Sequence, residues 1–165
     1  MEQGKKLSNL RAQLQETSNF SDIQTAISEM MSNKAFQAKS SVYNNHVYKL
    51  SHLYVSGDID FAQVFCLMQG GYLVEINDLA EFNFVMTFVR THYSSYVWVG
   101  TRYDENTKTW RYMATGGVMT VLSSIAGSQD ASPAGETCLC LSGSSNLEDE
   151  KCNVSDRQFL CEIPA

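Results

Sequence analysis

The sequence predicts an α+β domain, with two helices and antiparallel sheets, that follows an N-terminal helix. Apolar residues recur at steps of three and four near the N-terminus, and two later segments open on Asp or Asn residues of the kind that cap helices. Short alternating runs rich in Val, Tyr and Trp flank polar turns, as strands do. The 165 residues, 44% of them hydrophobic, suffice for one domain with a sizeable core and one appendage.

Residues 1–40 predict an amphipathic helical neck. The gap between Leu14 and Phe20 is six residues where a heptad expects seven, and Ser21 with Gln24 forms a capping box at which the helix can restart. So narrow an apolar stripe must pack either on the head or on copies of itself, and the pattern favours neither. The apolar positions of the stripe are Leu7, Leu10, Leu14, Phe20, Ile23, Ile27 and Met30.

A globular head is expected over residues 47–165. Asp60 opens its first predicted helix, which ends at Gly70 and Gly71. A second helix runs to residue 92 and has Asn77 or Asp78 as its cap. A first strand, or pair of strands, precedes these helices, and the further predicted strands cover 72–76, 96–103, 109–113, 136–143 and 157–163.

Two irregular segments interrupt the predicted strands. The stretch from Gly116 to Thr137 is rich in Gly, Ser and Ala and has no clear period. A loop of this length inside a compact domain is usually functional. The second segment, Ser144 to Cys152, is an acidic turn between the last two predicted strands.

The net charge of −6 leaves no basic stripe to neutralise phosphates, so we expect neither nucleic acid nor an anionic membrane as a partner. No window of about eighteen apolar residues exists, which predicts no membrane insertion. The first residues lack the apolar centre of a signal peptide, and we interpret this as the result of its removal.

Five cysteines without the close pairs of a zinc site favour a disulfide framework with one thiol left over. Two glycosylation acceptors, Asn19 and Asn153, agree with an oxidising compartment. We therefore expect a secreted or extracellular protein, the alternative being a cytosolic protein with free thiols.

The order of the motifs resembles the C-type lectin-like domain over residues 47–165. The resemblance rests on a helix with Cys66, GGYLVEI, a helix with Glu81, the WVG of residues 98–100, W-x-Y, GETC, an acidic turn and the closing FLCE. The helical neck and the final CEIPA are similar to collectins in particular. The resemblance implies a trimerising neck and thus a homo-oligomer, with a trimer favoured.

The family pattern implies two disulfides, Cys66 with Cys161 and Cys138 with Cys152. Cys140 competes with Cys138, because residues two apart on a strand face the same way. The family's usual spacing favours Cys138, which leaves Cys140 as a free thiol. A small buried apolar residue is then the expected role of Cys140.

In sugar-binding relatives, calcium is held by Glu-Pro-Asn or Gln-Pro-Asp in the long loop, by a Glu before the late strand, and by Asn-Asp after a Trp. Counting without gaps brings residues 128–130 onto the tripeptide, Glu136 onto the single Glu, and 147–149 onto Trp-Asn-Asp. The candidate calcium ligands are therefore Asp130, Glu136, Glu148 and Asp149. The candidate ligand-binding residues are Ser128, Gln129, Asp130 and Glu148.

Three departures from the family pattern favour an exposed acidic loop over a calcium and sugar site. Gln129 replaces a Pro whose cis bond shapes the loop, and a non-Pro cis bond costs about 2.5–4 kcal/mol. No amide stands at the aligned ligand positions, and Leu147 replaces the structural Trp. A second family calcium site is also disfavoured, because Tyr103 and Thr107 fall on positions that would be acidic.

Catalysis is not indicated, since the three histidines are isolated and no GxSxG, Walker or GxGxxG motif occurs. We expect a non-enzymatic extracellular recognition module that binds a glycan or protein ligand with a degenerate calcium site. One alternative is a calcium-dependent lectin with an atypical loop. The other is a receptor-like or inhibitor-like module that binds another polypeptide.

Overall fold

A computed structural model describes the head of the protein. The chain divides into two compact units, Met1–Lys34 and Ala35–Ala165. The predicted neck up to residue 33, with its capping box and Asn19, lies outside the described residues. The described residues run from 34 to 165, without Tyr54, Tyr93, Ala126, Ser128, 132–134 and Ser145.

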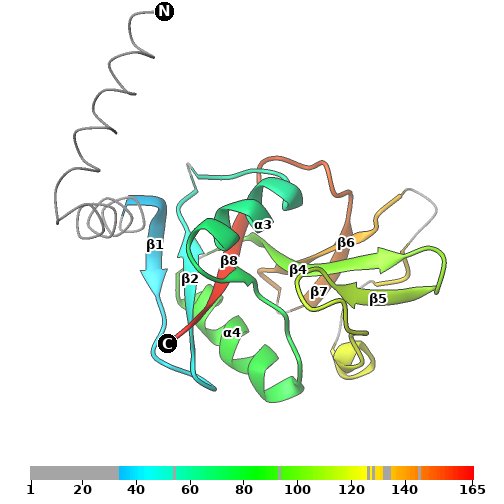
Figure 1. Cartoon of the computed structure of the whole chain (residues 1–165), viewed down its shortest axis with the longest axis horizontal. Helices are drawn as coiled ribbons and strands as arrows, with labels where there is room; N and C mark the ends of the chain where they lie inside the picture. The colour runs from blue at the N-terminus through cyan, green and yellow to red at the C-terminus, as the bar shows by residue number, and fades with distance from the viewer. Residues whose placement is uncertain are drawn as a thin grey trace, which may run out of the picture. The chain divides into compact units, whose positions relative to one another are not determined.

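The strands of the described head are β1 (Phe36–Lys39), β2 (His46–Ser51), β3 (Tyr72–Leu73), β4 (Tyr96–Asp104), β5 (Thr109–Tyr112), β6 (Cys138–Ser142), β7 (Asn146–Glu150) and β8 (Gln158–Pro164). Their order is β1-β2-β8-β4-β6-β7, with β3 paired to β8 and β5 to β4 (Figure 1). The pairing of β4 with β8 is parallel and the others are antiparallel. The predicted α+β class is confirmed.

Helix α3 (Ile59–Met68) begins two residues earlier than the sequence suggested. Asp58 is its cap, since its side chain accepts from the Phe61 backbone N–H at 2.8 Å. Asp60 already lies in the first helical turn and pairs with Arg102 at 2.9 Å. The helix ends where Gly70 adopts a φ of +82°, a left-handed conformation that favours glycine.

Helix α4 (Leu79–Thr91) begins after Asp78, whose carboxylate accepts from the Glu81 N–H at 2.7 Å. This settles the choice between the two predicted caps. The Asn77 N–H instead donates to the Glu81 carboxylate at 2.8 Å. The buried positions of α4 recur at helical spacing, so one face packs on the sheet.

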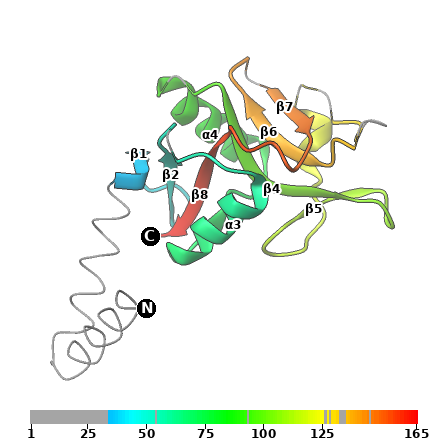
Figure 2. The ribbon, with the colours of Figure 1, turned by 90° about the horizontal axis from the view of Figure 1, so that it is seen from above.

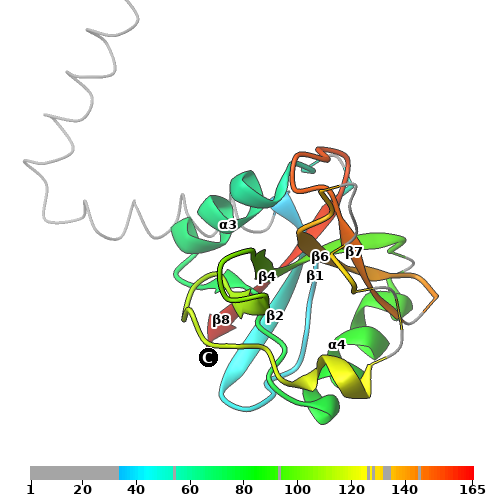
Figure 3. The same cartoon turned by 90° about the vertical axis from the view of Figure 1, so that its right-hand side faces the viewer.

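The two helices cover opposite faces of the sheet (Figures 2 and 3). Because strand side chains alternate between faces, Val97 and Val99 of β4 join the cluster of α4, whereas Trp98 joins that of α3. Trp98 is fully buried, and its indole N–H donates to the Gly57 carbonyl at 3.0 Å. Trp98, Trp110 and Tyr112 are therefore core residues, as expected.

Two strands appear where the sequence predicted none, β1 at the end of the stretch predicted as the helical neck of residues 1–40 and β7 in the predicted acidic turn. Strand β1 lies in the polar stretch before residue 47, because Phe36 packs on Phe65 and Phe159 with ring centroids 5.8 and 6.4 Å apart. Strand β7 occupies most of the segment interpreted as an acidic turn. Its single buried residue, Leu147, lies opposite Leu141 of β6, and one apolar position was too little to reveal a strand.

The predicted strand over residues 72–76 is shorter than expected. Tyr72 and Leu73 pair with β8. Val74 lies between two strands, since its N–H donates to the Leu160 carbonyl of β8 and its carbonyl accepts from the Gly100 N–H of β4. The buried side chains of Val74 and Ile76 explain why this stretch has the composition of a strand.

Candidate functional site

Two disulfides fix the elements that carry the long loop. Cys66 on α3 is bonded to Cys161 on β8, and Cys138 on β6 to Cys152 after β7, with Cα–Cα distances of 5.3 and 5.2 Å. These are the pairs that the family pattern implies. The second disulfide holds the point at which the long loop enters β6.

Cys140 is the free cysteine and is buried on β6, between Trp98 of β4 and Glu148 of β7. Burial raises the pKa of its thiol to about 12. The thiolate that would act as a nucleophile is therefore scarce at neutral pH. Cys140 packs as a small apolar side chain, which is its expected role.

A buried carboxylate holds the root of the long loop. Glu75 follows β3 and is only 2% exposed. Its carboxylate accepts from the Ala114 N–H at 2.7 Å, from the Thr115 N–H at 3.1 Å and from the Thr115 hydroxyl at 2.8 Å. The loop therefore leaves the sheet at a position fixed by three hydrogen bonds to one side chain.

The first half of the loop is packed on the core. Met119, Val121 and Ile125 are buried in the cluster that also holds α4, and Val121 begins a short 3-10 helix, η1 (Val121–Ser124). The Met119 N–H donates to the Trp110 carbonyl at 2.8 Å. These three apolar side chains hold the stretch from Met119 to Ile125 on the core.

Gln129 fastens the loop to two strands. Its backbone carbonyl accepts from the Trp110 indole N–H at 3.0 Å, and its side-chain amide donates to the Leu147 carbonyl at 2.6 Å. Gly127 makes the close approach feasible, because a Cβ there would lie 1.8 Å from the Leu147 carbonyl oxygen. The amide that was a candidate for sugar recognition therefore donates inward, to the protein itself.

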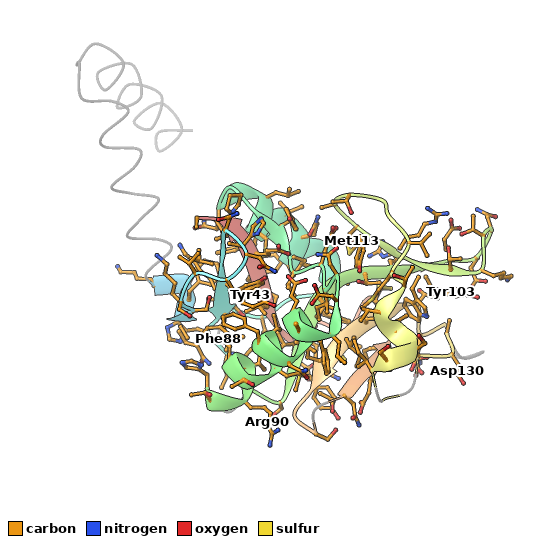
Figure 4. The ribbon with its side chains drawn as sticks, turned by 90° about the horizontal axis from the view of Figure 1, so that it is seen from below. Tyr43, Phe88, Arg90, Tyr103, Met113 and Asp130 are labelled. Atoms are coloured by element: carbon orange, nitrogen blue, oxygen red, sulfur yellow. A yellow bond between two sulfur atoms is a disulfide. The ribbon has the colours of Figure 1, made fainter. Side chains whose placement is uncertain are left out.

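The four candidate calcium ligands lie on three separate segments. Asp130 is exposed in the loop (Figure 4), Glu136 is half-buried before β6, and Glu148 and Asp149 are half-buried on β7. Within the described part of the chain, no three His, Cys, Asp or Glu side chains gather in a group that could hold a metal ion. Calcium binding by these four acids, which would require six to eight oxygen ligands, stays a prediction. Ser128 lies outside the described residues.

A second group of acids, which the sequence analysis did not single out as functional, is buried. Glu81 is 4% exposed, and its carboxylate accepts from the Tyr48 hydroxyl at 2.6 Å. Glu162 is 2% exposed and accepts from the Glu75 N–H at 3.1 Å, with His46 Nδ1 3.6 Å from its other oxygen. Together with Glu75 they form a hydrogen-bonded network that connects β2, β8, α4 and the loop root.

Burial raises the pKa of the Glu162 carboxyl to about 7, against the smaller opposing effect of the Glu75 N–H. The pKa of the Tyr48 hydroxyl is also raised, first by burial and then by its hydrogen bond to Glu81. The sequence held a signal for this network. Glu75 and Glu162 each interrupt an apolar run, YLVEI and FLCEI, and a charged residue inside such a run needs a partner.

The family model of the Lectin C-type domain matches residues 56–163. A search of curated proteins gave no match. No helix among the described residues is long and apolar enough to cross a membrane.

Three solved structures share the fold. Human lithostathine is 18% identical, with a TM-score of 0.62, over 78% of this chain and 98% of that one. The natural killer cell receptor Ly49C is 19% identical, with a TM-score of 0.58, over 78% and 94%. A complex of SPL-1 with GlcNAc is 17% identical, with a TM-score of 0.63, over 79% and 96%.

Domains of this family are generally binding modules rather than enzymes. The matched segment includes both helices and all four disulfide-bonded cysteines of the head. It also covers more than half of the 165 residues. The chain therefore belongs to the C-type lectin domain family.

Proposed function

We propose that this protein is an extracellular recognition module that binds a glycan or protein ligand through the long loop and β7, without the calcium and sugar chemistry of the family's lectins. The observation that carries this proposal is the use of Gln129. Its amide is bonded to Leu147 and its carbonyl to Trp110, so the residue closes the loop onto the sheet. A calcium-dependent site would need these groups and the surrounding acids to face one metal ion.

The outer side of the same region suits ligand contact. Asp130 is exposed, and Asn146 and Glu148 are half-buried on β7. The carboxylates of Asp130 and Glu148 can accept hydrogen bonds from hydroxyl or amino groups of a ligand, and the Asn146 amide can both donate and accept. Because Gln129 anchors the neighbouring loop backbone to β5 and β7, little conformational entropy is lost there when a ligand binds.

The alternative of a calcium-dependent lectin is supported by the similarity of the fold to SPL-1, which was solved with GlcNAc. A receptor-like module that binds another polypeptide is supported in the same way by Ly49C. A glycan array probed with and without EGTA separates these functions. We expect weak or no glycan binding, unchanged by EGTA, whereas strong EGTA-sensitive binding to a defined sugar would establish the calcium-dependent lectin.

Variants assign any binding to the loop and β7. Glu148→Gln removes one charge on β7 and should lower any binding that the wild type shows on the glycan array. Glu105→Gln removes an exposed charge in the β4–β5 turn and should leave that binding unchanged. Equal binding by the two variants would place the ligand elsewhere on the head.

A homo-oligomer, with a trimer favoured, is part of the proposal, because weak single sites gain affinity through multivalency. Its support is the predicted neck of residues 1–40. Sedimentation of residues 1–165 measures the mass, and a monomer would refute the oligomer. The two disulfides support a secreted or extracellular location.

Glycosylation agrees with that location. Asn153 is exposed in the turn after Cys152, where an oligosaccharyl group has room. Treatment of the secreted protein with a glycosidase should therefore lower its mass, and Asn153→Gln should abolish the part of the change that comes from this site.

A further inference from the structure

The turn at the start of the long loop is docked on a buried acid. Residues 113–117 lead from β5 into the loop, and Ala114 and Thr115 within them are exposed. From the buried side, the Glu75 carboxylate accepts from both of their N–H groups and from the Thr115 hydroxyl. One buried side chain therefore holds an exposed turn on the domain.

The turn also has hydrogen bonds of its own. The Gly116 N–H donates to the Tyr112 carbonyl at 3.0 Å, and the Tyr112 N–H donates to the Gly117 carbonyl at 2.8 Å. Gly116 supplies the left-handed φ of +75° that the turn requires. The turn can thus separate from Glu75 as a unit, and a local opening of this kind costs less free energy than unfolding of the domain.

Glu75 belongs to the network of three buried acids. Its N–H donates to the Glu162 carboxylate at 3.1 Å, and Glu81 adds a third carboxylate from α4. Burial is the largest cause that raises the pKa of the Glu162 carboxyl to about 7, and the charges of Glu81 and Glu75 raise it further. A proton on Glu162 therefore lowers the electrostatic cost of the closed network.

The other groups around Glu162 come from the strands packed against it. His46 Nδ1 of β2 lies 3.6 Å from its carboxylate and lowers its pKa. Burial raises the pKa of the phenol groups that face the acids, so these phenols stay neutral between pH 5 and pH 8. They are Tyr48 and Tyr72, which lie opposite Glu162 on β2 and β3, and Tyr112 on β5.

Separation of the turn from Glu75 changes the surroundings of these acids. Water then reaches Glu75 and the carboxylates behind it, and the cost of a charge on Glu162 falls. The closed state therefore binds the Glu162 proton more tightly than the open state does. This difference favours closure at low pH, and the advantage is lost as the pH rises through about 7.

We propose that the turn of residues 113–117 is a pH-sensitive switch, which stays docked on Glu75 while Glu162 is protonated and opens more often when Glu162 is ionised. Because this turn begins the long loop, its opening loosens one end of the proposed ligand surface. Weaker ligand binding at pH 8 than at pH 5 follows, and this consequence alone rests on the proposed function.

Hydrogen exchange of the Ala114 and Thr115 amides tests the switch in the ligand-free full chain by NMR at pH 5 and pH 8. After correction for the intrinsic pH dependence of exchange, the opening of these amides should increase by about tenfold or more at pH 8. The Gly143 N–H, which donates to the Ser95 carbonyl at the β6–β7 turn, should change less. No increase at residues 114 and 115, or an equal increase at Gly143, would overturn the proposal.

Three variants identify the group that takes up the proton. Glu162→Gln, which stays neutral, should abolish the increase at pH 8. Glu105→Gln removes an exposed charge in the β4–β5 turn, and His46→Gln removes the imidazole beside Glu162; both should retain the increase. An increase that persists in Glu162→Gln, or that is lost in His46→Gln, would contradict the assignment to Glu162.

A further variant tests the docking of the turn on Glu75. Thr115→Val removes one of the three hydrogen bonds to the carboxylate and should increase the opening of the Ala114 amide several-fold at both pH values. Thr87→Val, which removes an exposed hydroxyl bond on α4, should leave it unchanged. Equal exchange in the two variants would show that Glu75 does not hold the turn. Since no ligand is present in these measurements, a failure of the proposed function would leave their outcome unchanged.

Discussion

Two sets of acidic residues in this head have opposite surroundings and opposite uses. The outer set, Asp130, Glu136, Glu148 and Asp149, lies exposed or half-buried around the long loop and β7. The inner set, Glu75, Glu81 and Glu162, is at most 4% exposed. The outer acids lie near one another along the chain, and this spacing made them candidate calcium ligands. The inner acids are scattered along it and meet only in the fold, where they connect the C-terminal strand to the loop root.

The difference teaches that an acidic run is weak evidence for a metal site, while an isolated acid in an apolar run is strong evidence for a structural network. A buried carboxylate must be satisfied by several donors, and Glu75 has three of them. An acid at the surface is satisfied by water. Substitutions in the inner set should therefore affect stability, and those in the outer set should affect ligands.

The largest expected effect is that of Glu75→Ala. It leaves the Ala114 and Thr115 N–H groups without their acceptor at the loop root, and the free energy of unfolding should fall by about 3 kcal/mol or more. Urea denaturation measures it. Glu105→Ala, an exposed residue paired with Lys108, should change stability by less than about 1 kcal/mol. Similar losses in both variants would erase the distinction between inner and outer acids.

The next effect is a pH dependence from Glu162. The folded-state pKa of its carboxyl, about 7, lies above its ordinary value of 4.5, so the folded state binds the proton more tightly than the unfolded state. The stability from this group is fully present below pH 4.5 and is lost as the pH rises through 7. The expected loss is about 3 kcal/mol.

Denaturation at pH 5 and pH 8 measures this loss, and Glu162→Gln, which stays neutral throughout, should remove it. Titratable groups other than Glu162 contribute equally to both proteins unless they couple to its carboxylate. The same pH dependence in the wild type and the variant would show that Glu162 is ionised in the fold.

Part of the fold could be predicted from the sequence, and part depends on contacts between distant residues. Motif order was sufficient for the fold and both helices, because caps and helix-ending glycines act through local geometry, whereas the disulfide pairs followed from the resemblance to the family. The cap of α3 at Asp58 and the strand β7 were missed. The cap is a local bond from the Phe61 N–H to Asp58, two residues before the Asp60 that the sequence suggested. Strand β7 depends on a distant neighbour, since its buried Leu147 pairs with Leu141 of β6.

The candidate site was harder to predict for the same reason. Alignment brought Gln129 to a ligand position, but its side chain bonds to Leu147, 18 residues later in the chain. The network of Glu75 with Glu162 spans 87 residues and has no local pattern beyond a lone acid in an apolar run. Contacts of this range depend on the completed fold, which no single sequence motif encodes.

A smaller effect is expected at the boundary between the two sets, where Gln129 holds the loop. Gln129→Ala removes the hydrogen bond to the Leu147 carbonyl and should cost about 1 kcal/mol. The loosened loop should also expose the Trp110 indole N–H, which donates to the backbone carbonyl of residue 129. Exchange of this proton by NMR should quicken, while the buried Trp98 indole N–H should be unaffected. Equal exchange of both protons would mean that the apolar anchors alone hold the loop.

The smallest expected effect on stability is that of Glu148→Gln on the outer surface. Its half-buried carboxylate lies on β7 outside the inner network, and a charge change at such a site alters the free energy of unfolding by about 0.5 kcal/mol or less. Calcium should also leave the melting temperature of both proteins unchanged. A ligand that binds only the folded state raises stability by about 2.7 kcal/mol at 100 times its Kd, so a functional calcium site would be evident in a thermal shift. If calcium raised the melting temperature of the wild type but not of Glu148→Gln, the outer acids would form a metal site, and their separation in this structure would be a property of the metal-free state.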